Sequence, residues 1–168
     1  RPKDLVPVRP QLAEPTTGET MGQAAERMAK ENGITREAQD KWALRSHRRA
    51  ARGMEDGRLT AEITPVYLPP AFETIVNWDN GVRVDTSLRI LEGLSPVFDK
   101  KHGSVTAGNA SPLTDGGAAL VLMSSQAVEA HGVKPLAWIR SYAITALDPG
   151  AQLLQGPSYA APLALDRA

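Results

Sequence analysis

Cysteine is absent from this chain of 168 residues. Without a thiol the chain forms no disulfide, offers no thiolate ligand to a metal and has no thiolate nucleophile. The three histidines, His47, His102 and His131, are far apart, and their spacing matches no metal-binding motif. We therefore predict neither a metal site nor a catalytic residue in this sequence.

A charge excess and long apolar runs are also missing. Nineteen Lys and Arg residues balance nineteen Asp and Glu residues, so the net charge is zero. A neutral chain argues against nucleic acid or an anionic membrane as the main partner, although a local group of arginines can still hold a small anion. No run approaches the roughly 18 apolar residues that a membrane span needs, and no signal-peptide pattern is present. We therefore expect a cytoplasmic protein.

The most informative stretch covers residues 103–124. It begins with a strand-like segment, passes through a turn rich in Gly, Asn and Ser, and ends in the apolar run Ala118–Met123. Small side chains in the turn let a ligand or another backbone approach closely. The apolar run is typical of a strand buried on both faces.

The first helix is expected after an irregular segment, residues 1–19, that contains four prolines. Thr20 is a suitable N-cap, and Gln23 three residues later completes a capping box. Small and apolar residues then recur with a helical period until Gly33, which is expected to close the helix.

A longer helix is predicted over residues 36–55, with Thr35 as its N-cap and Gly57 after its end. Small or apolar residues line one face of this helix: Ala38, Trp42, Ser46, Ala50 and Met54. Residues 63–67 suggest an edge strand, because Pro65 cannot donate to a ladder. A short helix capped by Asp85 or Thr86 should follow.

The last seventy residues have an α/β pattern. A helix over about 125–131 separates the apolar run Ala118–Met123 from a second one, Leu136–Thr145, so a β-α-β unit with a roughly parallel pair is predicted. Pro162 suits the first turn of a final helix, which would stop after about two turns. We therefore expect an α/β protein that is a piece of a longer one.

Seven landmarks along the chain carry a family resemblance. They occur in order at residues 17–26, 34–47, 94–98, 103–124, 135–136, 148–149 and 156–157. Together they resemble the thiolases, the coenzyme-A-dependent acyltransferases that make or split 3-ketoacyl-CoA. The chain is most similar to the fatty-acid-oxidation branch and to the β subunit of the trifunctional complex.

The resemblance implies a partial thiolase fold, in which a helix-rich loop domain joins part of an α/β layered core with mixed or parallel strands. Residues 1–100 would form the loop domain, residues 101–134 the end of the N-terminal half, and residues 135–168 the truncated start of the C-terminal half. The family's nucleophilic cysteine would lie before this chain, and its Asn-Glu-Ala-Phe, Gly-His-Pro and second-cysteine motifs after it.

The implied function is acyl transfer between acyl-CoA and CoA, by thiolytic cleavage or Claisen condensation of 3-ketoacyl-CoA in β-oxidation or a related pathway. This chain would supply the CoA-binding part and be inactive alone. CoA and acyl-CoA are substrates, and no covalently bound cofactor is implied. The parent would be a homodimer or tetramer, and a hydratase/dehydrogenase α subunit is an implied partner.

Four residues match positions that contact CoA in the family. Arg83 would face the nucleotide end, where a guanidinium pairs with phosphate or stacks on adenine. Phe98 would offer an aromatic wall. Ala107 and Ser111 would line the pantetheine arm, Ala107 being small enough for the arm to pass and Ser111 polar enough to bond its amides.

Two further residues, Leu12 and Met21, match positions that line the acyl or pantetheine channel. The chain departs from the short thiolases beside Met21, where it has Thr20 in place of a histidine. This departure fits a different acyl-chain preference.

Each of these residues also has an ordinary structural interpretation. Met21 and Phe98 suit a hydrophobic core, Arg83 suits a solvated surface, and Ser111 suits a turn cap. Asn109 suits a left-handed turn position rather than a ligand contact.

Two other functions remain open on the sequence alone. One is a stand-alone, non-catalytic CoA-binding or assembly module related to thiolases, and the other is a plain α/β interaction domain. The intact mass of the source protein discriminates between a segment of an enzyme and a module.

Overall fold

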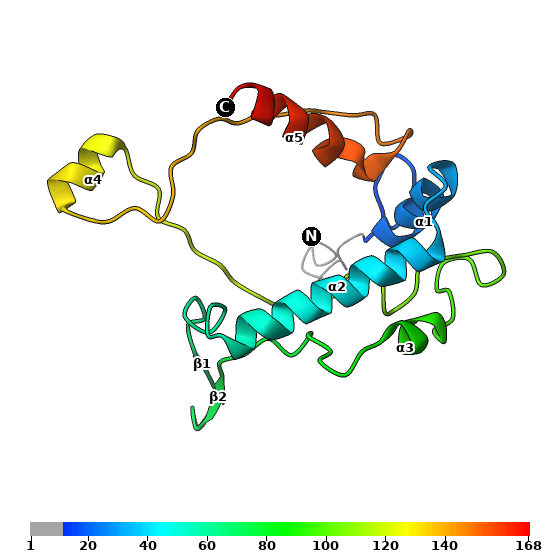
Figure 1. Ribbon diagram of the computed structural model, residues 1–168, viewed down its shortest axis with the longest axis horizontal. Helices are drawn as coiled ribbons and strands as arrows, with labels where there is room; N and C mark the ends of the chain where they lie inside the picture. The colour runs from blue at the N-terminus through cyan, green and yellow to red at the C-terminus, as the bar shows by residue number, and fades with distance from the viewer. Residues whose placement is uncertain (1–11) are drawn as a thin grey trace, which may run out of the picture.

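A computed structural model describes residues 12–168 of this protein (Figure 1). Most of the expected irregular segment, residues 1–11, lies outside the described residues. The remainder of that segment runs in irregular structure, with an antiparallel bridge between Ala13 and Thr20, to the first helix.

Helix α1 spans Met21–Glu31 and begins as predicted. The Thr20 hydroxyl accepts from the Gln23 backbone N–H at 3.3 Å, and the Gln23 side-chain oxygen accepts from the Thr20 N–H at 2.9 Å. These reciprocal bonds satisfy two of the donors that a helix start leaves free. Gly33 follows with a φ of 64°, which confirms the expected helix end.

Helix α2 spans Arg36–Glu55 and crosses the molecule (Figure 1). The Thr35 hydroxyl accepts from the Ala38 N–H at 3.1 Å, and Gly57 after the helix has a φ of 79°, so both predicted ends are confirmed. The apolar face is not buried within the described chain. Trp42 is 67% exposed, whereas Leu44 and the charged Asp40 are buried.

A short antiparallel hairpin follows α2. Strand β1 (Val66–Leu68) pairs with strand β2 (Thr74–Val76), with Tyr67 opposite Ile75. The first strand lies close to the predicted edge strand, directly after Pro65. The second strand was not predicted, because it is only three residues long and has no alternating pattern of its own.

Helix α3 spans Leu88–Glu92, and its N-cap corrects the prediction. The cap is Ser87, whose hydroxyl accepts from the Ile90 N–H at 3.3 Å, and not Asp85 or Thr86. Three adjacent residues can all cap a helix, so the local sequence does not choose between them. The choice places Leu91 at the only fully buried position of the helix.

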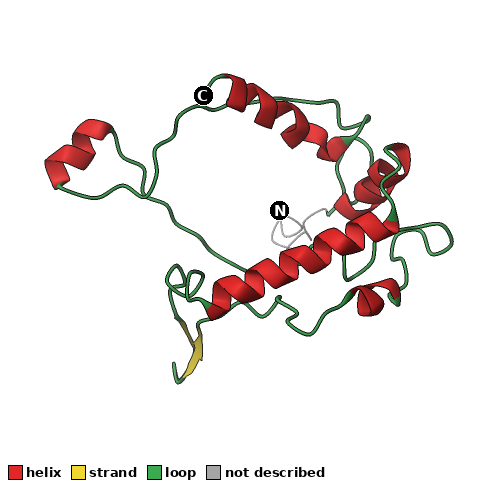
Figure 2. Cartoon of the chain, viewed as in Figure 1, coloured by secondary structure: helices red, strands yellow, loops and turns green. Residues whose placement is uncertain are grey.

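The predicted parallel pair of strands is not formed in this chain. Residues 118–123 and 136–145 are loops among the described residues, although helix α4 (Ser125–His131) lies between them as expected (Figure 2). Most of their side chains are exposed, with Leu120 at 90% and Ile144 at 85%. A strand is held by a bonded neighbour, and the described chain provides none for these runs.

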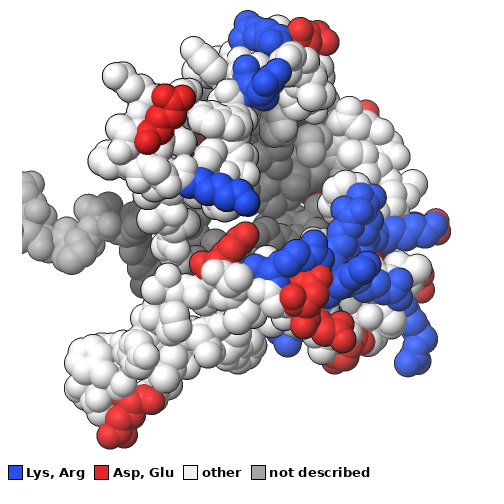
Figure 3. All heavy atoms as spheres, turned by 60° about the vertical axis from the view of Figure 1, so that its left-hand side comes forward, with Lys and Arg blue, Asp and Glu red and all other residues white. Residues whose placement is uncertain are grey.

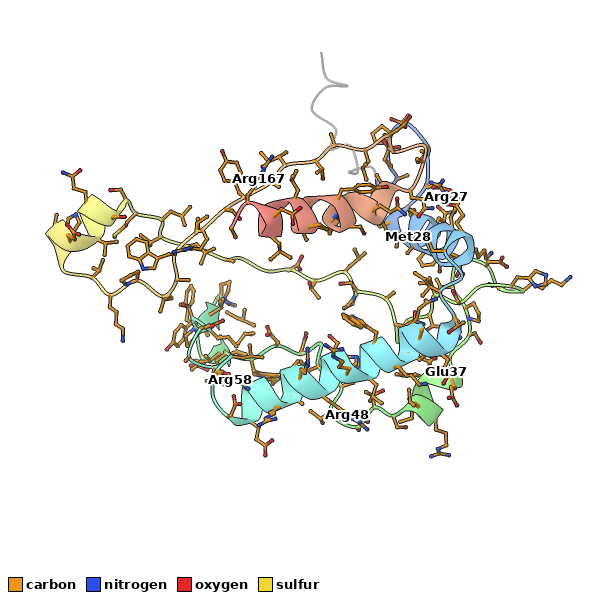
Figure 4. The ribbon with its side chains drawn as sticks, turned by 45° about the horizontal axis from the view of Figure 1, so that its top comes forward. Arg27, Met28, Glu37, Arg48, Arg58 and Arg167 are labelled. Atoms are coloured by element: carbon orange, nitrogen blue, oxygen red, sulfur yellow. The ribbon has the colours of Figure 1, made fainter. Side chains whose placement is uncertain are left out.

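The last helix, α5, spans Gly156–Asp166 and follows a short 3₁₀ turn at Leu153–Gln155. It starts six residues before Pro162, which lies inside the helix rather than in its first turn, so that prediction was wrong. Pro157 is the residue that occupies the first turn. Arg27 of α1 donates to the backbone carbonyls of Gly150 and Ala151 and so ties the approach to α5 to α1 (Figure 4).

The core of the described chain is small, and the loop of residues 103–109 forms its centre. Among residues 12–168, α1 and α2 do not pack directly on each other; both bind this loop. The buried apolar residues are Ala24, Ala29, Leu44, Leu91 and Val105, and the buried polar residues are Glu26, Asp40 and Thr106. None of the described helices is long and apolar enough to cross a bilayer.

Candidate functional site

Glu26 of α1 binds the start of the loop formed by residues 103–109. One carboxylate oxygen accepts from the Ser104 N–H at 2.7 Å and from the Ser104 hydroxyl at 2.9 Å, and the other accepts from the Val105 N–H at 2.9 Å. Glu26 is only 4% exposed. A buried carboxylate is tolerated here because donors surround both of its oxygens.

Asp40 of α2 binds the other end of the same loop. Its carboxylate accepts from Arg36 Nε at 2.8 Å and from the Asn109 side-chain amide at 2.9 Å, and the residue has no exposed surface. Arg36 also donates to the carbonyl of Leu91, within α3, and to that of Leu94, just after this helix. One buried ion pair therefore joins α2, α3 and the loop.

Asn109 is not in a left-handed conformation, which corrects the sequence interpretation. Its side-chain oxygen accepts from the Thr106 N–H at 2.7 Å, while its amide nitrogen donates to the Ser104 carbonyl and to Asp40. The amide therefore closes the loop on itself and anchors it to α2. Within this anchored segment the side chain of Ala107 remains exposed, and so does that of the following Ser111.

A pocket of about 490 Å³ lies beside this loop. It is lined by Arg83, Ala107 and His47 together with residues 80–86, α3 and the segment 107–114. The His47 ring accepts from the Arg83 N–H at 3.1 Å through Nδ1, which fixes the backbone at Arg83 against α2. The pocket thus brings together two of the six predicted contact residues, and we call it the Arg83 pocket.

Ser111 lies in an adjoining groove of about 680 Å³ between α2 and residues 108–112. The groove and the Arg83 pocket share His47, Gly108, Ala110 and Pro112 as lining residues. The exposed ring of Trp42 lines the groove, and the Arg45 guanidinium lies 4.8 Å from its centroid. Ser111 makes no side-chain hydrogen bond within the described chain, so its hydroxyl is available to a ligand.

The other three predicted residues form a second group at the start of α1. The bridge between Ala13 and Thr20 brings Leu12 to the end of the helix where Met21 lies. The Phe98 ring packs over Gly22, so closely that a Cβ atom at Gly22 would overlap it. Leu12, Met21 and Phe98 remain 70%, 47% and 40% exposed, so they are not core residues in the described chain.

A charged turn closes the loop on the side of α1. Lys30 of α1 lies 2.5 Å from the Asp99 carboxylate, which also accepts from the N–H groups of Lys101 and His102. The Lys30 hydrogen bond, helped by these two backbone donors, lowers the pKa of Asp99 to about 2. Figure 3 shows that Lys and Arg side chains gather on one side of the molecule with acidic side chains among them.

His47, Asp40 and Glu26 are residues of this site that the sequence interpretation missed. His47 was considered only as a metal ligand, although it belongs to the landmark segment 34–47. Glu26 and Asp40 also lie in landmark segments, but each has charged neighbours in its helix, and burial is what separates it from them. No cluster of three or more His, Asp or Glu side chains among residues 12–168 is arranged to hold a metal ion.

Comparison with known sequences identifies one family. Residues 3–126 match the family model described as thiolase, N-terminal domain. The chain is 52% identical over 166 residues to a 3-ketoacyl-CoA thiolase of Serratia proteamaculans, covering 99% of this chain and 38% of that protein. It is 50% identical over 168 residues to a 3-ketoacyl-CoA thiolase of Erwinia tasmaniensis, covering all of this chain and 38% of the relative.

Solved structures show the same relationship. The human mitochondrial 3-ketoacyl-CoA thiolase superposes with a TM-score of 0.83 at 35% identity, over 93% of this chain and 39% of that one. A Bacillus anthracis acetyl-CoA acetyltransferase superposes with a TM-score of 0.74 at 38% identity, over 88% of this chain and 39% of that one. The fold class predicted from the sequence is confirmed, and the chain spans less than two fifths of the length of these relatives.

Proposed function

This chain belongs to the thiolase N-terminal domain family, and from that premise we propose that it is the CoA-binding segment of a 3-ketoacyl-CoA thiolase. The parent enzyme would transfer acyl groups between acyl-CoA and CoA. The share of the relatives' length that the chain covers supports a segment, and the identities near 50% support this activity for the parent. The thiolate nucleophile that acyl transfer needs would come from outside this sequence.

The Arg83 pocket is the observation that carries the proposal. The Arg83 guanidinium would bind the nucleotide end of CoA, where it can pair with phosphate or stack on the base. The pantetheine arm would pass Ala107, whose methyl group leaves room, and its amides would bond to the Ser111 hydroxyl in the adjoining groove.

The buried network behind the pocket supports this assignment. The loop that carries Ala107 is held from α1 by Glu26 and from α2 by Asp40, so its position does not depend on a bound ligand. A contact surface fixed in advance loses less entropy on binding than a mobile one. The second group, at the start of α1, would face the acyl or pantetheine channel through Leu12, Met21 and Phe98.

The stand-alone CoA-binding module remains the second candidate, because the sequence contains no cysteine. Both candidates predict CoA binding, and they differ in the intact mass of the source protein. For the parent we propose a homodimer or tetramer, a hydratase/dehydrogenase α subunit as a partner, and a cytoplasmic location in fatty-acid oxidation.

Equilibrium dialysis of the 168-residue chain against CoA tests the function common to both candidates. We expect Arg83→Ala to weaken CoA binding about tenfold, because a hydrogen bond to a charged group contributes roughly 1.5–3 kcal/mol when desolvated and less at an exposed position. Ser111→Ala should have a smaller effect, since a neutral hydrogen bond contributes about 1 kcal/mol. Arg89→Ala, on α3 outside the pocket lining, is the matched control.

If the chain is a segment of an enzyme, kinetics of the full-length protein test the position of Arg83. Arg83→Ala should raise KM for CoA and leave kcat nearly unchanged, because a contact at the nucleotide end acts equally in the ground and transition states. Unchanged CoA binding by Arg83→Ala at low salt would show that Arg83 is a surface charge.

A further inference from the structure

A second, smaller pocket adjoins the Arg83 pocket. It has a volume of about 280 Å³ and lies between α2 and residues 83–86. His47, Arg83 and Thr86 line both pockets. A ligand held at Arg83 is therefore next to this second space, which we call the arginine pocket.

Basic side chains from two elements meet at the arginine pocket. Arg48 and Arg52 come from one face of α2, and Arg83 comes from the opposite wall. Glu55, almost one turn beyond Arg52, is the one carboxylate among the lining residues. Figure 4 shows Arg48 on the side of α2 that faces away from α5.

The arginines of this pocket form no ion pair within the described chain, although Arg52 lies near the Asp56 carboxylate. No ion pair between residues 12–168 involves Arg48, Arg52 or Arg83, whereas Arg27, Arg36 and Arg58 each pair with a carboxylate. Arg48 and Arg52 are four residues apart on one helix, and like charges at that spacing repel each other and disfavour the helix. An anion between them would remove this repulsion.

The two walls of the pocket are held together by His47. Because Nδ1 accepts from the Arg83 N–H, the neutral ring carries its proton on Nε2. The backbone at Arg83 is thereby held to α2, so the two walls of the pocket keep their spacing before a ligand arrives. The exposed arginine side chains can then turn toward a compact group with several acceptor oxygens.

We propose that the arginine pocket binds a phosphate monoester, and that its occupant is the ribose 3′-phosphate of CoA. A phosphate monoester carries a charge of about −1.5 to −2 at neutral pH and three acceptor oxygens, which suit several guanidinium groups at once. The inference rests on the proposed CoA-binding function, since only a nucleotide held at Arg83 brings this phosphate to the pocket.

Binding of CoA and of 3′-dephospho-CoA to the 168-residue chain tests the proposal by isothermal titration at low salt. The two ligands differ only in the 3′-phosphate. We expect the chain to bind CoA about tenfold more tightly, and this preference to shrink as salt is added. Arg48→Ala/Arg52→Ala should lower the affinity for CoA to that for 3′-dephospho-CoA and leave the latter unchanged.

Unchanged binding of 3′-dephospho-CoA also shows that the double variant is folded. Arg49→Ala is the matched control, because Arg49 lies on the same helix outside the pocket lining and should leave the preference intact. Titration with inorganic phosphate alone distinguishes a free anion from the nucleotide phosphate.

Equal binding of the two ligands by the unsubstituted chain would overturn the inference and leave the proposed function standing. A preference for CoA over 3′-dephospho-CoA that survives in the double variant would also overturn it, since the 3′-phosphate would then bind elsewhere. Tight binding of inorganic phosphate together with equal affinities for the two ligands would assign the pocket to free phosphate. Failure to bind either ligand, by a chain whose helices are shown by circular dichroism to be formed, would instead refute the proposed function.

Discussion

Removing the Asp40 carboxylate should destabilise the chain far more than removing an exposed carboxylate from the same helix. Asp40 has no exposed surface and joins Arg36 of α2 to Asn109 of the loop. Asp40→Ala leaves a partly buried guanidinium and a side-chain amide each without one partner. Glu37→Ala is the matched control, because Glu37 forms an ion pair of the same helical spacing with Lys41 at the surface (Figure 4).

The loss of unfolding free energy expected for Asp40→Ala depends on the bonds that Arg36 and Asn109 keep. Breaking a fully buried ion pair from one side costs about 3–5 kcal/mol. Here the Arg36 side chain is 24% exposed and keeps its bonds to the Leu91 and Leu94 carbonyls, and Asn109 keeps its bond to the Ser104 carbonyl. We therefore expect a loss of about 2–4 kcal/mol for Asp40→Ala and no measurable change for Glu37→Ala.

Two measurements check this expectation. Urea unfolding followed by circular dichroism gives the free energy of unfolding, and hydrogen exchange reports the Thr106 amide, which bonds to Asn109. A loss of 2–4 kcal/mol corresponds to an increase in Thr106 exchange of about 30- to 700-fold. Asp40→Asn, which keeps the shape and loses the charge, should lie between the native chain and Asp40→Ala.

Equal unfolding free energies for Asp40→Ala and Glu37→Ala would show that the Asp40 carboxylate does not anchor the loop. In that case the loop would be held by the contacts of Glu26 alone. If Asp40→Ala does not fold, the smaller change in Asp40→Asn and the coupling between Asp40→Asn and Asn109→Ala still decide the matter.

Three further outcomes are expected. The purified chain should not cleave acetoacetyl-CoA, because it has no thiol to accept the acyl group; turnover above a heat-killed control would contradict this. The chain should self-associate and bind an apolar dye through the exposed runs 118–123 and 136–145, so sedimentation as a monomer with little dye binding would count against it. Asp99→Asn should lower the stability of the chain at pH 6, and its difference from the native chain should shrink as pH falls. The reason is that the pKa of Asp99 is lowered from 3.8 to about 2, so its stabilising contribution is complete above about pH 5 and is lost toward pH 2. A difference that is constant with pH would exclude this pair as its source.

Local capping signals were the part of the fold that the sequence specified best. A capping residue bonds or turns the backbone within a few residues of its own position, so a single sequence is sufficient to locate the ends of α1 and α2. The capping residues of these helices are Thr20 with Gln23, Thr35, Gly33 and Gly57. The same local rules pointed to Asp85 or Thr86 as the cap of α3, whereas the cap is the next residue, Ser87.

Strands were predicted less well, because a strand needs a partner that the local sequence does not contain. The apolar runs 118–123 and 136–145 have the composition of buried strands, yet they remain unpaired in the described chain. In the hairpin, the first strand was predicted approximately and the second was missed. The second strand is only three residues long, and its partner lies close by in the sequence.

The family, the fold class and the two long helices can be inferred from the amino-acid sequence, because ordered motifs and helix caps are local features. Which charged residues are buried depends instead on how the elements pack. Glu26 and Asp40 resemble the surface carboxylates around them in sequence, and they became the supports of the loop 103–109 because that loop presents unpaired N–H and amide donors to them. Packing also divides the six predicted contact residues into two groups, one at the Arg83 pocket and its groove and one at the start of α1. Spacing along the sequence does not define distances across a fold, so this division could not be predicted.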